Sequence, residues 1–161
     1  MRAIAVLAIA GCNSLVGVGD YPSLLDAPRP ICADLYDNLY ADHRYKIYGN
    51  AETYDRARMQ CELDGAHLLK IEAADEKALA KVIIGSRGDS WIGLDDLAEE
   101  GRFAWYDGTP ATFTDWKSNE PNGSTDENCV VDNGNDPGWN DTKCGDTRPY
   151  ICECEQSTPV N

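Results

Sequence analysis

Six cysteines spread over residues 32–154 constrain the fold of this chain more than any other feature. A seventh, Cys12, lies near the start, so the total is odd. Structural disulfides persist in oxidising compartments, and seven cysteines in 161 residues are unusual for a cytosolic protein. Six cysteines allow many pairings, and the sequence alone does not choose among them. We therefore predict an exported, cross-linked domain in which at least one cysteine has another role.

The first twelve residues indicate a role for Cys12. Arg2 precedes an apolar run, Ala3 to Ala10, that is too short to span a bilayer as a helix. The following Ile9-Ala10-Gly11-Cys12 resembles the lipobox of bacterial lipoprotein signals. This resemblance implies cleavage before Cys12, a diacylglyceryl group on its sulfur, and a protein exported and lipid-anchored at a bacterial-type membrane or cell surface. The apolar run is shorter than usual for an export signal, so an ordinary buried strand is the alternative.

The formal net charge of −14 argues against nucleic acid as a partner, because a polyanion would be repelled. It also argues against adhesion to anionic lipid through a basic face. Clustered carboxylates repel one another unless something neutralises them, and a bound cation is one means. A plain acidic surface is the alternative, so the placement of the acids decides between the two.

Composition divides the chain into four parts. We predict a signal peptide over residues 1–11, a tether over 12–30, one folded domain over 31–154 and a polar tail over 155–161. The tether prediction rests on Gly, Pro, Ser and Asp residues that occur without periodicity. The length suits a single domain.

Two helices are predicted inside the domain. The first covers about 53–64, with Thr53 as N-cap and Gly65 after its end. Its buried face should carry residues at positions i, i+3 and i+7, namely Tyr54, Ala57 and Cys61. The second helix covers about 74–84 and ends at Gly85. Short strand-like runs predict strands at 67–71, 90–94, 102–106, 128–131 and 150–153. The helices and strands together predict an α+β fold.

The segment 107–143 is rich in Gly, Pro, Asn, Asp and Trp and shows little regular structure. A long irregular segment inside a compact domain is usually functional. Its carboxylates and amides gather at 120–122, 126–128 and 140–141, and the two histidines of the chain, His43 and His67, lie outside it. We interpret both histidines as ordinary surface or core residues.

An all-oxygen set without imidazole or thiolate favours calcium over zinc or copper. We predict a primary Ca²⁺ site with five side-chain ligands and one backbone carbonyl. The side chains are those of Glu120, Asn122, Glu127, Asn140 and Asp141.

Three motifs and four of the cysteines together resemble a C-type lectin domain. The motifs are Trp91-Ile-Gly-Leu94, Glu120-Pro-Asn122 and Trp139-Asn-Asp141, and the resemblance covers about Cys32 to Glu153. It implies a C-type lectin-like fold, with two helices packed on small antiparallel sheets and a long calcium-binding loop region. It also implies calcium-dependent binding of glycans rather than enzymatic activity.

The resemblance further assigns roles to the five ligands. Two vicinal sugar hydroxyls would bind the ion, donate to carboxylates and accept from amides, which explains the mixture of acids and asparagines. Glu120 with Asn122 would hold one hydroxyl, Glu127 with Asn140 the other, and Asp141 would ligate through side chain and backbone. The Glu-Pro-Asn order resembles lectins for mannose, fucose and N-acetylglucosamine, whereas galactose lectins tend to carry Gln-Pro-Asp. In this family Pro121 usually follows a cis bond.

An auxiliary Ca²⁺ site is common in the family. Its ligands here would be Asp96, Glu100, Glu127 and Asn128. This chain departs from the pattern because Gly123 stands where an acid is usual and the loop to Glu127 looks one residue short. Asp126 is a candidate replacement, so the auxiliary site is left open.

The resemblance also pairs cysteines. It implies the bridges Cys61–Cys152 and Cys129–Cys144, the second at the base of the calcium loop. Arg44 occupies a position that holds a cysteine in longer family members, so that hairpin bridge is absent. Cys32 and Cys154 are left over near chain ends that run side by side in this fold, and we predict that they pair.

Other interpretations of the same residues remain. Glu120 and Glu127 could be a glycosidase acid and base, but nothing in the sequence marks a raised pKa or a sugar cleft. A stacking platform for sugar could be formed by Trp91, Trp105, Trp116 and Trp139, but the resemblance implies that the motif tryptophans Trp91 and Trp139 are core residues. The main alternative function is a protein–protein interaction module of the same fold in which calcium is only structural. The sequence predicts neither the natural glycan nor the oligomeric state.

Overall fold

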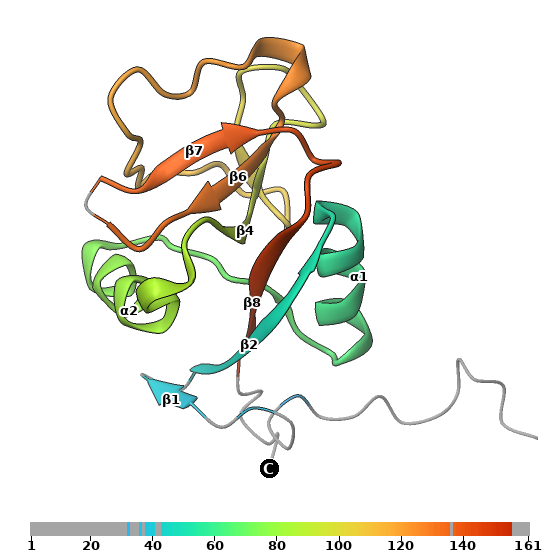
Figure 1. The fold of residues 1–161 in the computed structure, drawn as a ribbon, viewed down its shortest axis with the longest axis vertical. Helices are drawn as coiled ribbons and strands as arrows, with labels where there is room; N and C mark the ends of the chain where they lie inside the picture. Colours follow the sequence, from blue (N-terminus) through green and yellow to red (C-terminus); the bar gives the residue numbers. More distant parts are fainter. Residues whose placement is uncertain (1–31, 33–35, 37, 41–42, 136, 156–161) are drawn as a thin grey trace, which may run out of the picture.

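The computed structural model describes residues 32, 36, 38–40, 43–135 and 137–155 (Figure 1). Its helices are α1 (Tyr54–Leu63) and α2 (Ala74–Ile84), with short 3-10 turns η2 (Gly85–Arg87) and η3 (Ser124–Asp126). The strands are β1 (Asn38–Tyr40), β2 (His43–Glu52), β3 (His67–Leu68), β4 (Ser90–Asp95), β5 (Ala104–Trp105), β6 (Cys129–Asp132), β7 (Trp139–Thr142) and β8 (Arg148–Glu155). The predicted signal peptide, Cys12 and the tether lie outside the described residues.

The strands form a continuous ladder in the order β1-β2-β8-β4-β6-β7, with β3 on β8 and β5 on β4. Every pairing is antiparallel except β4 with β8, which meet in parallel at Trp91 and Tyr150. The predicted small antiparallel sheets are therefore joined through one parallel bridge. In Figure 1 β2 and β8 build the lower half, β6 and β7 the upper half, and α1 lies beside β8.

Both helices were predicted correctly. Tyr54, Ala57 and Cys61 on α1 are fully buried, as their spacing indicates. Thr53 occupies the N-cap position, but its side chain makes no cap hydrogen bond, which corrects its expected role. Gly65 has a φ of 76°, the left-handed conformation that a glycine after a helix supplies.

The core has two clusters, one centred on Trp91 and the other on Trp139. Both indoles are fully buried, so the core prediction for these two tryptophans is confirmed. The Trp91 cluster packs α1 against β8, and the Trp139 cluster packs α2 against β4, β6 and β7. Since Trp139 directly precedes Asn140 and Asp141, core packing fixes the start of one ligand segment.

Three disulfides cross-link the described residues, and they are the three expected pairs. Cys61–Cys152 joins α1 to β8, and Cys129–Cys144 spans 15 residues around the β6–β7 hairpin. Cys32–Cys154 ties the start of the described chain to the end of β8. Glu155, predicted to lie in the tail, is instead the last residue of β8. Within the described residues, no helix has the length and apolar character needed to cross a membrane.

Candidate functional site

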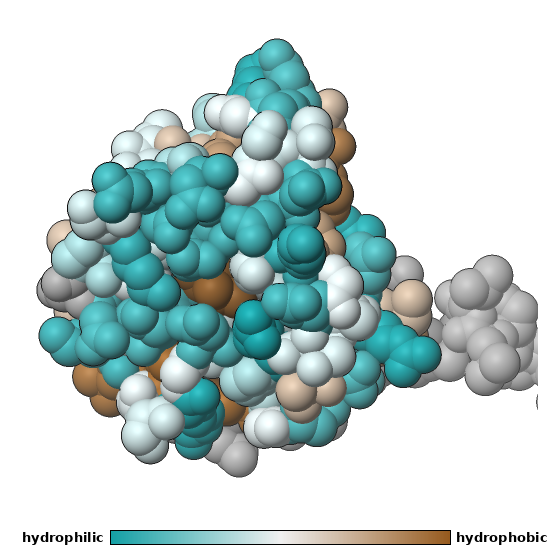
Figure 2. Space-filling model, turned by 45° about the horizontal axis from the view of Figure 1, so that its top comes forward, coloured by the Kyte–Doolittle hydropathy of each residue, from teal (hydrophilic) through white to brown (hydrophobic). Residues whose placement is uncertain are grey.

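The candidate site lies in the loops at the upper end of the molecule, beyond β6 and β7 (Figure 1). Trp116 pairs in parallel with Trp139, and the Lys117 N–H donates to the Trp139 carbonyl at 2.9 Å. The Glu120 N–H then donates to the Lys117 carbonyl at 3.0 Å. These backbone bonds carry the chain from the core into the 120–122 segment. The face that comes forward in Figure 2 is mostly hydrophilic.

Asp141 joins the two motif triplets. Its carboxylate accepts the backbone N–H of Asn122 at 3.0 Å and that of Gly123 at 2.9 Å. The Asn140 amide donates to the Asp141 carbonyl at 2.5 Å, so in this structure it is directed at the backbone. The Glu120–Pro121 peptide bond is cis, as the resemblance implied. Asp141 is therefore in direct contact with the backbone of Asn122 and Gly123, whereas the convergence of the five side chains on one ion stays a prediction.

Glu127 reaches the same place through η3. An ideal Cβ built on Gly123 would lie 2.0 Å from the Glu127 Cβ and 2.5 Å from its Oε2. No real Cβ tolerates such contacts, so the Glu127 side chain occupies space that only a glycine at position 123 leaves free. Gly123, which departs from the pattern that the resemblance implies, therefore makes room for the Glu127 side chain.

Glu120 is in an unfavourable environment for a carboxylate. Partial burial raises its pKa, and contact with Asp141 and the charge of Glu127 raise it further, while Lys117 opposes them. Its Oε2 is buried and accepts no hydrogen bond from the described chain. A buried anionic oxygen without a donor is destabilising unless a proton or a cation compensates it.

The predicted auxiliary ligands lie next to this cluster. The Asp96 N–H donates to the Asn128 carbonyl at 3.1 Å, and Asp96 Oδ2 accepts the Gly101 N–H at 2.7 Å. Asp96 Oδ1 is buried without a partner among the described residues. Desolvation and the charges of Asp96 and Asp141 raise the pKa of Glu100. Glu100 is therefore within electrostatic reach of both Asp96 and Asp141.

The arrangement is not a preformed metal cage. Among the described residues, no three His, Cys, Asp or Glu side chains are grouped so as to hold a metal ion. Asp141 instead uses both carboxylate oxygens on backbone donors. The donor chemistry nevertheless fits a hard cation, because the set is all oxygen and two of its buried carboxylate oxygens lack a donor. The five-ligand site and the auxiliary site both stay predictions.

Two features of this region were missed from the sequence. Lys117 acts on the charge of Glu120, and the Tyr54 hydroxyl donates to Asp95 Oδ2 at 2.9 Å beside Asp96. Neither has a periodic signal, because both depend on contacts between distant segments. His43 and His67 interact with Glu153 and Glu155 at the other end of β8, which agrees with their exclusion from the site.

Comparisons with known proteins place most of the described residues in one family. The family model described as Lectin C-type domain matches residues 50–154. An alpha-N-acetylgalactosamine-specific lectin of Patiria pectinifera is 35% identical over 127 residues, 71% of this chain and 76% of the relative. Some relatives are much longer proteins: the match spans 34% of the human C-type lectin domain family 17, member A (37% identical) and 3% of the bovine versican core protein (35% identical).

Solved structures share the fold. The carbohydrate-recognition domain of the mouse scavenger receptor C-type lectin superimposes with a TM-score of 0.71 and 29% identity, covering 76% of this chain and 95% of that domain. A calcium-independent type II antifreeze protein gives a TM-score of 0.68 and 28% identity, covering 73% of this chain and 90% of that protein. The fold is therefore shared by lectins and by a protein whose name declares independence of calcium.

Proposed function

Because the chain belongs to the C-type lectin domain family, we propose that it binds carbohydrates in a calcium-dependent manner. The ligand would be a sugar with vicinal equatorial hydroxyls, as in mannose, fucose or N-acetylglucosamine. The observation that carries the proposal is the buried Glu120 Oε2, which lacks a donor among the described residues, while contact with Asp141 and the charge of Glu127 raise the pKa of its carboxyl group. A hard cation would neutralise the charges of these three carboxylates. The relatives of this chain are lectins, which are non-enzymatic binding domains.

Each residue of the site has a distinct task in this proposal. A bound Ca²⁺ would supply coordination positions for two hydroxyl oxygens. Glu120 and Glu127 accept the hydroxyl protons, while the Asn122 and Asn140 amides donate to the hydroxyl oxygens. Asp141 holds the 120–122 segment through its backbone contacts and contributes side-chain and carbonyl oxygens. A shallow site for two hydroxyls would bind a monosaccharide with a dissociation constant of about 1 mM.

Asn140→Asp tests this division of tasks. The variant keeps an oxygen for the cation and loses the amide donor, so calcium affinity should stay within about threefold while sugar binding is lost. Calorimetric titration with Ca²⁺, followed by mannose in saturating Ca²⁺, measures both. The exposed Asn50 provides the matched Asn50→Asp control. Unchanged mannose affinity in Asn140→Asp would refute the role given to the amide.

Sugar preference is a separate part of the proposal. The Glu120-Pro-Asn122 order supports a mannose-type preference, whereas one relative is named for N-acetylgalactosamine. Glycan-array binding in calcium should be displaced by mannose more strongly than by N-acetylgalactosamine. The reverse order would keep calcium-dependent lectin activity and overturn the mannose-type assignment.

The second candidate is a protein-binding module with at most structural calcium. The engagement of Asp141 by backbone donors favours it, as does the calcium-independent protein of the same fold. Array binding with and without EGTA separates the two candidates. Binding that neither EGTA nor free mannose changes would support the protein-binding module.

Anchoring at a cell surface is a further proposal, since Cys12 lies outside the described residues. The three disulfides support an oxidising compartment. Lipidation at Cys12 would cluster the domains, so that weak single sites bind a glycan surface with avidity. Cys12→Ser should move the protein from the membrane fraction to the soluble fraction, and retention in the membrane fraction would contradict the lipid anchor.

A further inference from the structure

Lys77 on α2 is a lysine buried in the protein interior, with 4% of its side chain exposed. Its ammonium lies 2.7 Å from each carboxylate oxygen of Asp132 and 3.0 Å from Asp115 Oδ2. Asp132 is fully buried and also accepts the Gly134 N–H at 2.8 Å. One cation therefore holds two carboxylates that come from different segments of the chain.

The residues around this ammonium lie at one end of each of the three ligand segments. Asp115 begins the stretch that leads through Lys117 to Glu120. Asp132 ends β6, and Glu127 lies just before the start of the same strand.

The third segment starts at Gly138. Its N–H donates to the Asp115 carboxylate at 3.0 Å and also to the Asp115 carbonyl at 3.1 Å. Gly138 directly precedes Trp139, Asn140 and Asp141.

Only glycine fits at position 138, where the chain passes the Lys77–Asp132 ion pair. A Cβ on Gly138 would lie 2.6 Å from the Lys77 Nζ and 2.5 Å from Asp132 Oδ1. The backbone of the third segment is thus in direct contact with the buried ion pair. Removal of the ammonium would leave Asp115 and Asp132 as neighbouring carboxylates without a cation, and such a buried pair repels.

We propose that Lys77 is a positioning residue: its buried ammonium fixes one end of each of the three segments that carry Glu120, Glu127 and Asp141, and so preorganises the calcium and sugar site without touching it. This inference rests on the proposed function. It assigns the internal cation the task of holding the segments in register, so that ligand binding orders only the outer residues.

Lys77→Met is the first test, with Lys81→Met as control, because Lys81 lies one turn further along the same helix and is exposed. Calcium affinity should fall about tenfold in Lys77→Met and stay at the wild-type value in Lys81→Met. Calorimetry is done at a temperature where circular dichroism shows both variants folded. A folded Lys77→Met variant with wild-type calcium affinity would overturn the inference. Absence of calcium binding by the wild type would instead refute the proposed function.

Gly138→Ala displaces the ammonium without deleting it and serves if Lys77→Met does not fold. Gly145→Ala is its control, since a Cβ there meets nothing within 4 Å. Gly138→Ala should also weaken calcium binding about tenfold, and the double variant should be no weaker than either single one, because both act through one contact. Wild-type affinity in Gly138→Ala, or additive losses in the double variant, would count against Lys77.

Hydrogen exchange on the wild-type protein gives a readout that does not depend on calcium. In EGTA the amides of Lys117, Gly138 and Trp139 should stay protected, because the ion pair holds them, whereas those of Asn122 and Gly123 should exchange faster than in calcium. Loss of protection at Lys117 and Trp139 in EGTA would show that calcium, and not Lys77, organises these segments.

Discussion

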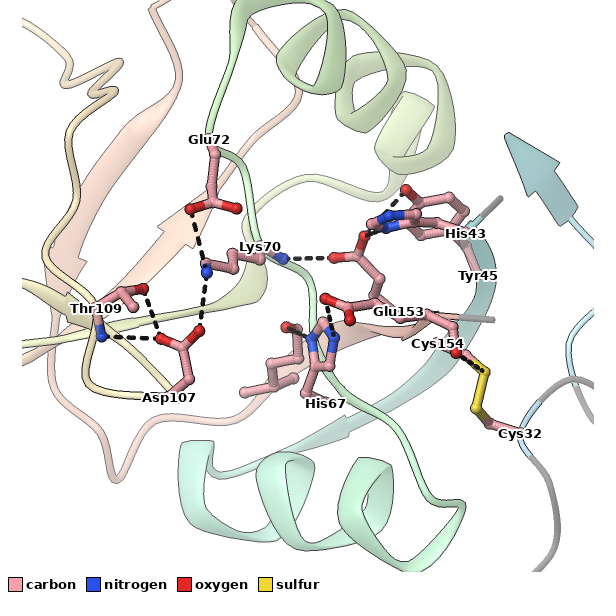
Figure 3. Close-up of polar contacts among 12 residues, drawn as sticks. Cys32, His43, Tyr45, His67, Lys70, Glu72, Asp107, Thr109, Glu153 and Cys154 are labelled. Carbon is pink, nitrogen blue, oxygen red and sulfur yellow. Dashed lines mark hydrogen bonds and ion pairs between the residues drawn. A yellow bond between two sulfur atoms is a disulfide. The ribbon is translucent and has the colours of Figure 1, made fainter. Parts of the chain in front are cut away.

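Two glutamates at opposite ends of the molecule are treated differently by their surroundings. Glu153 near the end of β8 is 3% exposed in its side chain and has three donors: His43 Nδ1 at 2.5 Å, the Tyr45 hydroxyl at 3.1 Å and the Lys70 N–H at 2.8 Å (Figure 3). Glu120 in the upper loops has a buried oxygen without a donor, and two other carboxylates act on it.

The pKa directions follow the same division. Beside the Glu153 contacts, burial would raise the pKa of Asp107, yet hydrogen bonds from Thr109 and Lys70 lower it to about 2. Burial and neighbouring acids raise the pKa of Glu120. The chain thus supplies enough donors to stabilise its own anions at the lower end and too few at the upper end. The contacts of Glu153, which we call the lower cluster, therefore need no external ion. The carboxylates of Glu120, Glu127 and Asp141 lack such donors and suit an external cation.

The largest expected effect comes from Glu120→Gln. Loss of a charged ligand should weaken calcium binding at least about 100-fold, measured by calorimetry. In EGTA the free energy of unfolding should stay equal or rise, because a carboxylate repelled by Asp141 and Glu127 is gone. Glu62→Gln on the exposed face of α1 is the control. Wild-type calcium affinity in Glu120→Gln would remove the difference between the two ends.

Glu153→Ala should have the opposite profile. It removes the acceptor of the His43 ring nitrogen and of the part-buried Lys70 N–H, so we expect a loss of about 2 kcal/mol in the free energy of unfolding. Calcium affinity should not change. Glu155→Ala, whose parent side chain is 64% exposed, is the control in chemical denaturation. A parallel loss of calcium affinity would mean that the two ends are coupled.

Gly123→Ala sharpens the account of the upper end. The new Cβ would displace the Glu127 side chain, so calcium affinity should fall about tenfold while stability changes by about 1 kcal/mol or less. Gly145→Ala, with open space at its Cβ, should leave both quantities unchanged. If Gly123→Ala keeps full affinity, Glu127 is not needed where the structure places it.

Sequence reasoning succeeded where the signal is local. The spacing of Tyr54, Ala57 and Cys61 and the glycines at 65 and 85 placed both helices, because helix faces and helix ends are set within a few residues. It missed β2, since only Tyr45 of its ten residues is buried and its pairing partner β8 is distant in the chain. It also missed β7, because two of its four residues, Asn140 and Asp141, are predicted ligands within the irregular segment 107–143.

The site shows the same limit. The triplets identified the segments that Asp141 brings together, but not the use of its carboxylate on backbone donors. The Lys77 ion pair was missed, although Lys77 shares a helix face with the buried Ala80 and Ile84, and a lysine on an apolar face is a usable signal. Its partner Asp132 lies 55 residues away, and no local pattern encodes such a pair.

The smallest expected effect is the pH dependence of the His43–Glu153 contact. Burial lowers the pKa of His43, but the hydrogen bond and charge of Glu153, with Glu155 and Glu76, raise it on balance. A raised pKa in the folded state stabilises the protein below the pKa of the unfolded chain, and this contribution disappears as pH rises through the folded-state pKa. His43→Gln should therefore lower the free energy of unfolding more at pH 6 than at pH 8, by less than about 1 kcal/mol for a contact of this exposure. Thermal unfolding of both proteins in EGTA keeps the upper carboxylates free of cation. An equal loss of stability in His43→Gln at the two pH values would show that the stability of the Glu153 contacts does not depend on the charge of His43. The Tyr45 hydroxyl and the Lys70 N–H would then be the donors that stabilise the Glu153 carboxylate.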